Sequence, residues 1–154
     1  MCASSFAGSD TTAIAMRSIL YFLMKNPKYY KKLQDEIDEA TARGELSTPT
    51  VRFSEASKLP YLIACCKEGM RMHPSVGFTL PRTVPAGGKE ISGRYFPAGS
   101  KVGIYSGVIH NDKSIFGDDA DVFNPDRWIE GDAANMDRYM FQVRASCCLF
   151  NTVC

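Results

Sequence analysis

No apolar run in the sequence approaches the ~20 residues that a helix needs to cross a bilayer. The N-terminal stretch MCASSFAGSDTTAIAM has no basic segment before an apolar core, so it does not read as a signal peptide. The net charge is only +1, which gives no reason to expect a nucleic-acid or acidic partner. A chain of 154 residues with 45% hydrophobic content has the size of one domain and can bury a core.

Cysteines at metal-binding spacing are also missing. The six cysteines include adjacent pairs at 65–66 and 147–148, and none forms a CxxC motif. Without a secretory signal we expect reduced thiols, and no structural zinc site. His73 and His110 have no acidic or cysteine neighbour at metal spacing; the pattern places His73 at a helix end and His110 at a strand end, and we assign neither a catalytic role.

The order of elements predicts a mainly α fold with a small antiparallel β-sheet. Apolar periodicity and proline breaks predict helices over 6–25, over 27–44 with Gly44 as the C-terminal cap, and over 61–72. Ser54 is the expected N-cap of a further short helix. Short runs between 75 and 108, punctuated by glycine and proline, predict hairpins. From residue 111 onward we expect mostly loop, anchored by aromatic side chains at Phe116, Phe123 and Trp128.

The motif AGSDTT at 7–12 lies in the first predicted helix. Gly8 is a poor helix former, and the Thr11 hydroxyl can donate to the Ala7 carbonyl, which bends a helix and opens a groove. A groove that holds this hydroxyl and the Asp10 carboxylate suits dioxygen binding and proton delivery. The alternative is an N-cap, with Ser9 or Asp10 starting the helix.

Glu68 and Arg71 in the motif KEGMR share one helical face because they are three residues apart. They could form a surface ion pair worth ~0.2–0.5 kcal/mol. Their apolar neighbours argue against full exposure, and a buried pair would need a further partner, for which Arg127 of FNPDRW is available. Arg82, in the motif LPR, offers a planar fork for a carboxylate, and the alternative is a solvated arginine.

The motifs AGSDTT, KEGMR, LPR and FNPDRW, in this order and at these separations, resemble the C-terminal half of a cytochrome P450, a haem-thiolate monooxygenase. The resemblance runs from Phe6 to about Gln142, and within this range the chain is similar to fungal microsomal members of the family. It predicts a truncated, partial P450 domain over 1–154, family-like over 1–142 and divergent over 143–154. It also implies a haem cofactor (iron protoporphyrin IX), a small apolar organic substrate, dioxygen, an NADPH-dependent reductase, and full-length relatives at the endoplasmic reticulum membrane.

The resemblance assigns roles residue by residue. It implies proton delivery by Asp10 and Thr11, a supporting network of Glu68, Arg71 and Arg127, a haem propionate contact at Arg82, and a substrate pocket near Phe78 and Thr79. The family's cysteine loop reads F-x-x-G-x-R-x-C-x-G. If Phe141 is the motif phenylalanine, Cys148 takes the position that binds the iron and the cofactor. The glycine, arginine and glycine positions are then occupied by Arg144, Ser146 and Phe150.

A second register ends the match at Gln142. Gln-Val can be encoded by CAG-GT, the sequence of a splice donor, so our hypothesis is that the tail VRASCCLFNTVC is a translated intron.

The substrate-recognition half and the membrane anchor of the family are missing from this sequence, and we expect low stability and a large exposed apolar surface. Two alternatives to a monooxygenase stay open: an inactive truncated or mis-spliced product, and a non-catalytic helical module that binds a partner chain.

Overall fold

The computed structural model describes residues 2–79 and 81–140, with side chains from residue 9 onward. The helices are α1 (Cys2–Lys25), α2 (Pro27–Ala42), α3 (Phe53–Ala56), α4 (Pro60–Met72), α5 (Ser106–Ile109), α6 (Lys113–Phe116), α7 (Arg127–Glu130) and α8 (Ala133–Arg138). The strands are β1 (Arg82–Thr83), β2 (Lys89–Ile91), β3 (Arg94–Phe96) and β4 (Lys101–Val102). These elements confirm a mainly helical chain with small antiparallel sheets.

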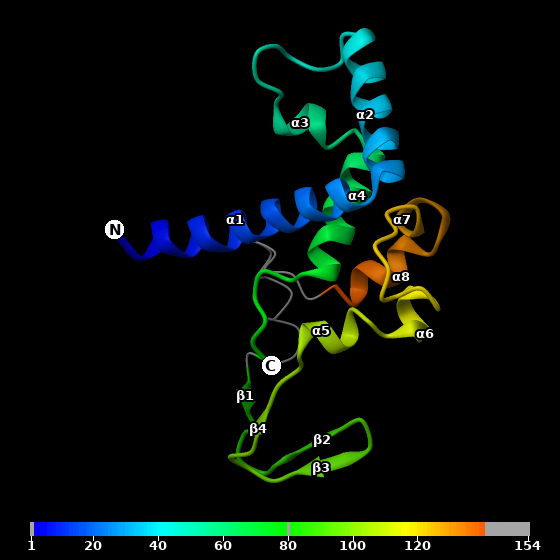
Figure 1. Cartoon of the computed structure of the whole chain (residues 1–154). Coiled ribbons are helices and arrows are strands. Elements are labelled where there is room, and N and C mark those ends of the chain that lie inside the picture. Colours follow the sequence, from blue (N-terminus) through cyan, green and yellow to red (C-terminus); the bar gives the residue numbers. More distant parts are fainter. Residues whose placement is uncertain (1, 80, 141–154) are drawn as a thin grey trace.

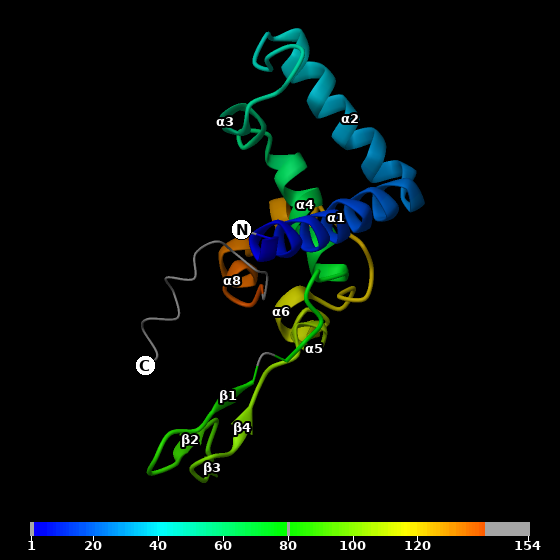
Figure 2. The ribbon, with the colours of Figure 1, turned by 90° about the vertical axis from the view of Figure 1, so that its left-hand side faces the viewer.

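The α4 helix occupies the centre of the molecule (Figure 1). On one side it is crossed by α1, and on the other it faces the segment that carries α6, α7 and α8. The crossing with α1 is close because Gly69 has no side chain: a Cβ there would lie 2.6 Å from Cγ1 of Ile19. Figure 2 shows the strands at the end of the molecule opposite α2 and α3.

The α1 helix continues without a break through the AGSDTT motif. The alternative in which Ser9 or Asp10 starts the helix is therefore wrong. One glycine inside a helix costs only ~1 kcal/mol relative to alanine, which the rest of a 24-residue helix can offset. The hydrogen bond that we predicted from Thr11 to Ala7 remains a prediction.

The α2 helix begins at Pro27 as predicted and ends at Ala42, two residues before the predicted position. Pro27 occupies its first turn, where the missing N–H has no helical partner to lose. Gly44 follows the helix with φ of +72°, the left-handed conformation that glycine adopts without strain. The N–H of Gly44 donates to Thr41 O at 2.9 Å and that of Glu45 to Ala40 O at 3.0 Å, which closes the end of the helix.

The predicted cap at Ser54 is wrong. The α3 helix begins at Phe53, and Arg52 occupies the N-cap position, so Ser54 lies inside the first turn. The backbone N–H of Arg52 donates to the Glu55 carboxylate at 3.1 Å, which stabilises the helix start in place of a serine hydroxyl. The α4 helix begins one residue earlier than predicted, at Pro60, and ends before His73 as expected.

The four strands form a nested hairpin. The inner pair joins β2 to β3, with Glu90 opposite Tyr95, and its turn at Ser92 and Gly93 has positive φ at both positions. This geometry matches the twist of a two-residue hairpin. The outer pair joins β1 to β4, with Arg82 opposite Val102. The hairpins predicted between residues 75 and 108 are thus present, followed at the end of that region by the short α5 helix.

The region after residue 111 was predicted as mostly loop, and this prediction missed α6, α7 and α8. Each has four to six residues, fewer than an apolar periodicity needs to become visible. His110, predicted at a strand end, instead caps α5. The predicted aromatic anchors are confirmed as buried: Phe116, Phe123 and Trp128 are 2%, 3% and 6% exposed.

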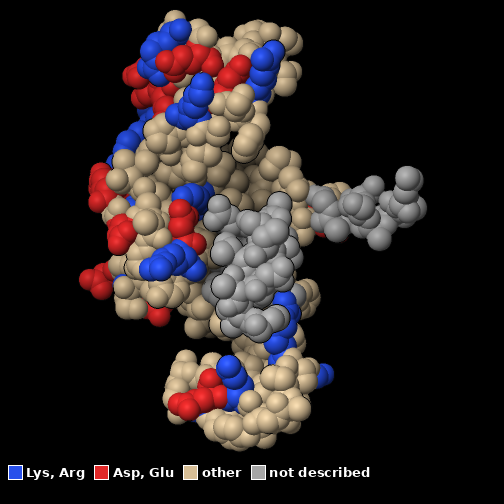
Figure 3. Space-filling view, turned by 180° about the vertical axis from the view of Figure 1, so that it is seen from behind, with Lys and Arg blue, Asp and Glu red and all other residues tan. Residues whose placement is uncertain are grey.

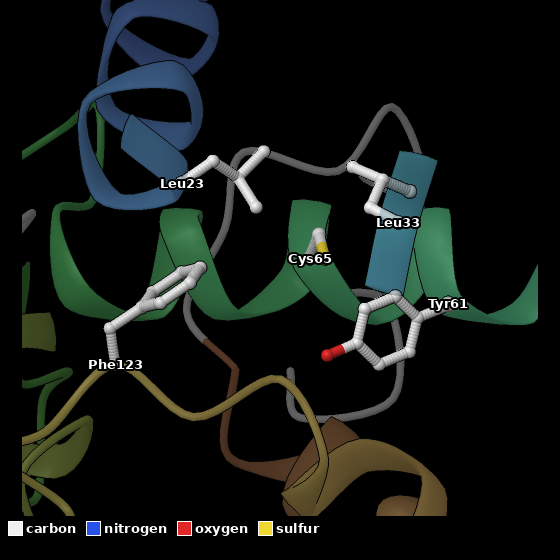
Figure 4. Packing of buried hydrophobic residues seen from close by; sticks show 5 residues of the cluster. All are labelled: Leu23, Leu33, Tyr61, Cys65 and Phe123. Atoms are coloured by element: carbon white, nitrogen blue, oxygen red, sulfur yellow. The ribbon is translucent and has the colours of Figure 1, made fainter. Parts of the chain in front are cut away.

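Buried apolar side chains line two faces of α4. On one face, Tyr61 and Cys65 pack with Leu23 of α1, Leu33 of α2 and Phe123 (Figure 4). The cluster on the other face contains Ala64, Phe116, Ala120, Trp128 and Met136. Because α4 contributes to both clusters, it fixes the position of α1 and α2 relative to the segment from 110 to 140.

Acidic and basic side chains are interspersed over the α2 end of the face seen in Figure 3, in keeping with the small net charge. Within residues 2–79 and 81–140, no helix is both long and apolar enough to cross a membrane. Of the cysteines in the described part, Cys65 and Cys66 are free thiols, as predicted.

Candidate functional site

The centre of the candidate site is an ion pair buried inside the molecule. Glu68 is 0% and Arg71 1% exposed, although both are charged. Their pairing is bidentate: Arg71 Nε donates to Glu68 Oε2 at 2.9 Å, and Arg71 Nη2 donates to Oε1 at 2.8 Å. The surface ion pair considered from the sequence is therefore wrong, because the apolar neighbours on α4 bury the pair.

Three further donors reach the same carboxylate from the segment after residue 122. Arg127 Nε donates to Glu68 Oε1 at 3.0 Å, Asn124 N to Oε1 at 2.9 Å and Trp128 Nε1 to Oε2 at 2.9 Å. Such bonds offset the desolvation of a buried carboxylate. The predicted contact between Glu68, Arg71 and Arg127 is present, and we call these residues with Trp128 the Glu68 network.

The remaining guanidinium protons of the network organise an irregular backbone. Arg71 Nη1 donates to the carbonyls of His110 at 2.5 Å and Ala120 at 2.6 Å. Arg127 donates to the Phe116 carbonyl and, at 2.9 Å, to the carbonyl of Asp119. The Asp119 carbonyl also accepts from the backbone N–H of Val122 at 2.9 Å, so the two arginines supplement the few turn hydrogen bonds of this irregular backbone.

His110 packs behind Arg71 and is fully buried. Its Nδ1 lies 3.0 Å from the backbone oxygen of Arg71. Burial lowers the pKa of the His110 imidazole, and the nearby Arg71 charge acts in the same direction, so the ring is neutral at pH 7. This position supports the structural role of the residue and gives it no access to a substrate.

Sequence reasoning missed several members of this cluster: His110, Asp119, Asn124 and Trp128. Asp119 Oδ1 accepts from Arg127 Nη1 at 2.9 Å, and hydrogen bonds from Asn124 and Arg127 hold the pKa of this carboxyl below its ordinary value. Two of these residues could have been predicted from the motif FNPDRW. Asn124 and Trp128 lie within three positions of Arg127, so they could be expected to reach the same partner, Glu68.

Asp10 and Thr11 lie on α1 at least eight positions before Ile19, the residue that packs on Gly69 where α1 crosses α4. Asp10 is exposed and Thr11 is half-buried, so both groups have access to solvent protons. Ser75 Oγ donates to the Thr11 backbone oxygen at 2.8 Å. This bond joins α1 to the segment that leads from α4 to β1.

The other three predicted contact residues lie on that segment and on β1. Phe78 is 80% exposed, and Thr79 and Arg82 are also exposed. Gly103 allows the backbone to pass close by: a Cβ there would lie 2.7 Å from Thr79 O. The structure thus places Phe78, Thr79 and Arg82 together on one stretch of chain, separate from the Glu68 network.

Cys65 and Cys66, the cysteines whose side chains the structure describes, do not fit an iron ligand. Cys65 is fully buried in the core, and burial raises the pKa of its thiol to about 12. Burial also raises the pKa of the Cys66 thiol, whereas a thiolate ligand needs a lowered pKa. No group of three metal-binding side chains occurs in the described part of the chain. Cys148, the predicted ligand, lies outside the described residues.

Comparison with known proteins decides the family. The family model described as Cytochrome P450 matches residues 3–142. The chain belongs to the cytochrome P450 family. The resemblance inferred from its four motifs is therefore confirmed, and this family uses haem with a cysteine thiolate as ligand.

Individual proteins that are similar to the chain support the same family. This P450 chain is 46% identical over 124 residues to a pisatin demethylase of Fusarium vanettenii, covering 80% of the chain and 24% of that protein. It is 45% identical over 139 residues to the cytochrome P450 monooxygenase ACRTS1 of Alternaria alternata, covering 90% of the chain and 36% of that protein. A zebrafish cytochrome P450 solved with progesterone matches 81% of the chain and 28% of its own length, with a TM-score of 0.69 and 29% identity.

The chain therefore spans about a quarter to a third of the length of these relatives. Membership of the family makes haem monooxygenase chemistry with an organic substrate, oxygen and a redox partner the general expectation for the complete proteins. The roles of individual residues in this chain are proposals.

Proposed function

We propose that this chain forms the haem-side part of a monooxygenase that inserts one atom of dioxygen into an apolar organic substrate. The electrons come from an NADPH-dependent reductase. The observation that carries the proposal is the buried Glu68 network, which ties α4 to the segment from 110 to 128. A rigid carboxylate with five donors is suited to hold that irregular segment in one position beside a large cofactor.

In this proposal Asp10 and Thr11 deliver protons. The exposed carboxylate of Asp10 takes a proton from solvent, and the hydroxyl of the half-buried Thr11 passes it on. Arg82 pairs with a propionate carboxylate of the haem, for which its planar guanidinium is suited. Phe78 and Thr79 contact the apolar substrate.

Cys148 is the proposed source of the thiolate. Haem, when bound through it, supplies the oxygen activation. Arg82 suits a propionate contact, and Cys65 and Cys66 do not fit an iron ligand, so the proposal requires Cys148 for that role. This requirement makes the cysteine the decisive residue to test.

The test is a carbon monoxide difference spectrum of the chain after haem reconstitution and reduction with dithionite. We expect the Soret band of a thiolate complex, its loss in Cys148→Ser and its retention in the neighbouring control Cys147→Ser. A chain that retains no haem and shows no such band would contradict the proposal. It would then be an inactive product of its family.

One observation favours a second candidate, a non-catalytic module that binds a partner chain. The outer face of α1 carries Met16, Leu20 and Met24 at helical spacing, with exposures of 57%, 59% and 76%. Tyr21 beside them is 56% exposed. A face of this kind suits the groove of a helical partner. Capture of a partner by the haem-free chain, abolished by Leu20→Glu, would support the module; retained capture by that variant would exclude this face.

A further inference from the structure

We infer that α2 is the positioning element of the Glu68 network, through Tyr29, Lys32 and Glu36. These residues lie at spacings of three and four, so they share one face of the helix. We call them the inner polar face of α2. The inference concerns residues outside the proposed catalytic roles, and it holds whether or not the chain binds haem.

Glu36 fixes the start of α4 from outside that helix. Its Oε1 accepts from the backbone N–H of Tyr61 at 2.8 Å, and its Oε2 from that of Leu62 at 2.9 Å. The first N–H groups of a helix have no partner within it, and their partial positive charge favours a carboxylate. Glu36 therefore sets the position and direction of α4, on which Glu68 follows two turns later.

Lys32 and Tyr29 hold the other side of the network. Lys32 Nζ lies 2.6 Å from Oδ1 of Asp126, the residue directly before Arg127. Tyr29 OH donates to Asn124 Oδ1 at 3.2 Å, and the backbone N–H of Asn124 donates to Glu68. The two contacts thus position the short segment that delivers Arg127 to the carboxylate.

The outer face of the same helix makes no comparable connection. Lys31 pairs with Asp35 of α2 itself at 2.6 Å, with side-chain exposures of 67% and 51%. Lys32 differs from its neighbour in reaching another element, and it also lies 4.6 Å from the centre of the Tyr61 ring. One face of α2 therefore contacts both parts of the chain that meet at Glu68, and we infer that it sets the distance between them.

The single tryptophan of the chain offers a direct reporter. Trp128 Nε1 donates to Glu68 Oε2, so its indole resonance in a ¹H–¹⁵N spectrum and the hydrogen exchange of its indole proton report on the network itself. We expect Lys32→Met to shift this resonance and to speed the exchange by up to about fivefold, the range of a partly exposed ion pair. Glu36→Gln weakens two charge-assisted bonds and should speed the exchange by roughly fivefold or more.

Matched controls separate positioning from general destabilisation. Lys31→Met removes a charge from the same helix and should leave the indole resonance and its exchange rate unchanged. Lys32→Arg keeps the positive charge at position 32 and should leave the resonance and the exchange rate close to those of the unmodified chain. An unaltered indole signal in Lys32→Met and Glu36→Gln would overturn the inference. If either variant fails to fold by circular dichroism, Lys32→Gln decides: an unperturbed indole signal in this folded variant contradicts the inference equally.

Discussion

Glu68 receives hydrogen bonds on both carboxylate oxygens from residues on α4, on α7 and in the loop before α7. A buried ion pair is a poor source of net stability, because desolvation of the charges opposes their attraction. Removing one partner is different, since it leaves the other charges buried without compensation. At the scale of the residue, our hypothesis is that the network enforces one arrangement of the chain more than it adds net stability.

Replacing Glu68 by glutamine should lower the free energy of unfolding by ~3–5 kcal/mol, because Arg71 and Arg127 then lose their shared anion. Urea denaturation measures this loss. The control is Glu39→Gln, since Glu39 contributes only an exposed pair with Arg43 at 3.7 Å and its replacement should leave stability almost unchanged. Equal effects of the two substitutions would show that the buried charge does not stabilise the fold.

His110 predicts a pH dependence. Its folded-state pKa lies below the ordinary value of 6.5, so the unfolded chain binds more protons between the two values. Its contribution to stability is therefore complete above about pH 6.5 and is lost as the pH falls toward the folded-state pKa. In His110→Gln, this part of the decrease in unfolding free energy at low pH should be absent. In His73→Gln, the control at the other histidine, it should remain. Urea denaturation at several pH values checks both, and identical pH profiles for all three proteins would contradict the prediction.

At the scale of the element, the crossing of α1 and α4 depends on Gly69. Gly69→Ala improves helix propensity by ~1 kcal/mol but places a Cβ 2.6 Å from Ile19 Cγ1 and 3.0 Å from the Ile19 Cα. We expect a net destabilisation of ~1–3 kcal/mol from overpacking, measured by urea denaturation. In a double-mutant cycle, Gly69→Ala should cost less free energy of unfolding when Ile19 has already been replaced by alanine.

Gly77 provides a control for this effect, because a Cβ there meets nothing within 4 Å. Gly77→Ala should leave the free energy of unfolding close to that of the unmodified chain. Additive effects of Gly69→Ala and Ile19→Ala would mean that the two helices can move apart without cost.

The elements also show what the sequence could and could not reveal. Apolar periodicity and proline placement located α2 and α4 because both helices are long enough to display a face. The shared face of Glu68 and Arg71 left a surface ion pair open, and it was the family resemblance that implied a buried network with Arg127. The donation from Trp128 was missed because it depends on how the loop before α7 folds back, which no local pattern encodes. The short helices α6 to α8 are held by tertiary contacts and have no periodicity of their own.

At the scale of the whole molecule, α1 is apolar on both sides but packs on only one. Leu23 is buried against α4, while Leu20 and Met24 are exposed. The expected exposed apolar surface is therefore confirmed on this helix; the low stability expected with it stays a prediction. A helix that is hydrophobic all round is normally buried, so this face needs either further chain or a partner to cover it.

The Glu68 network joins parts of the chain that lie 56 to 60 residues apart, and the whole nested hairpin lies between them. The peptide backbone of the hairpin is thus a covalent link between two pieces that are already fastened to each other. Inserting a specific protease site between Ala86 and Gly87 and cutting it should give two fragments that elute together in gel filtration and separate only in denaturant. In such a nicked molecule the association would become bimolecular, so Glu68→Gln, which we expect to cost ~3–5 kcal/mol in the intact chain, should make the two halves dissociate on dilution.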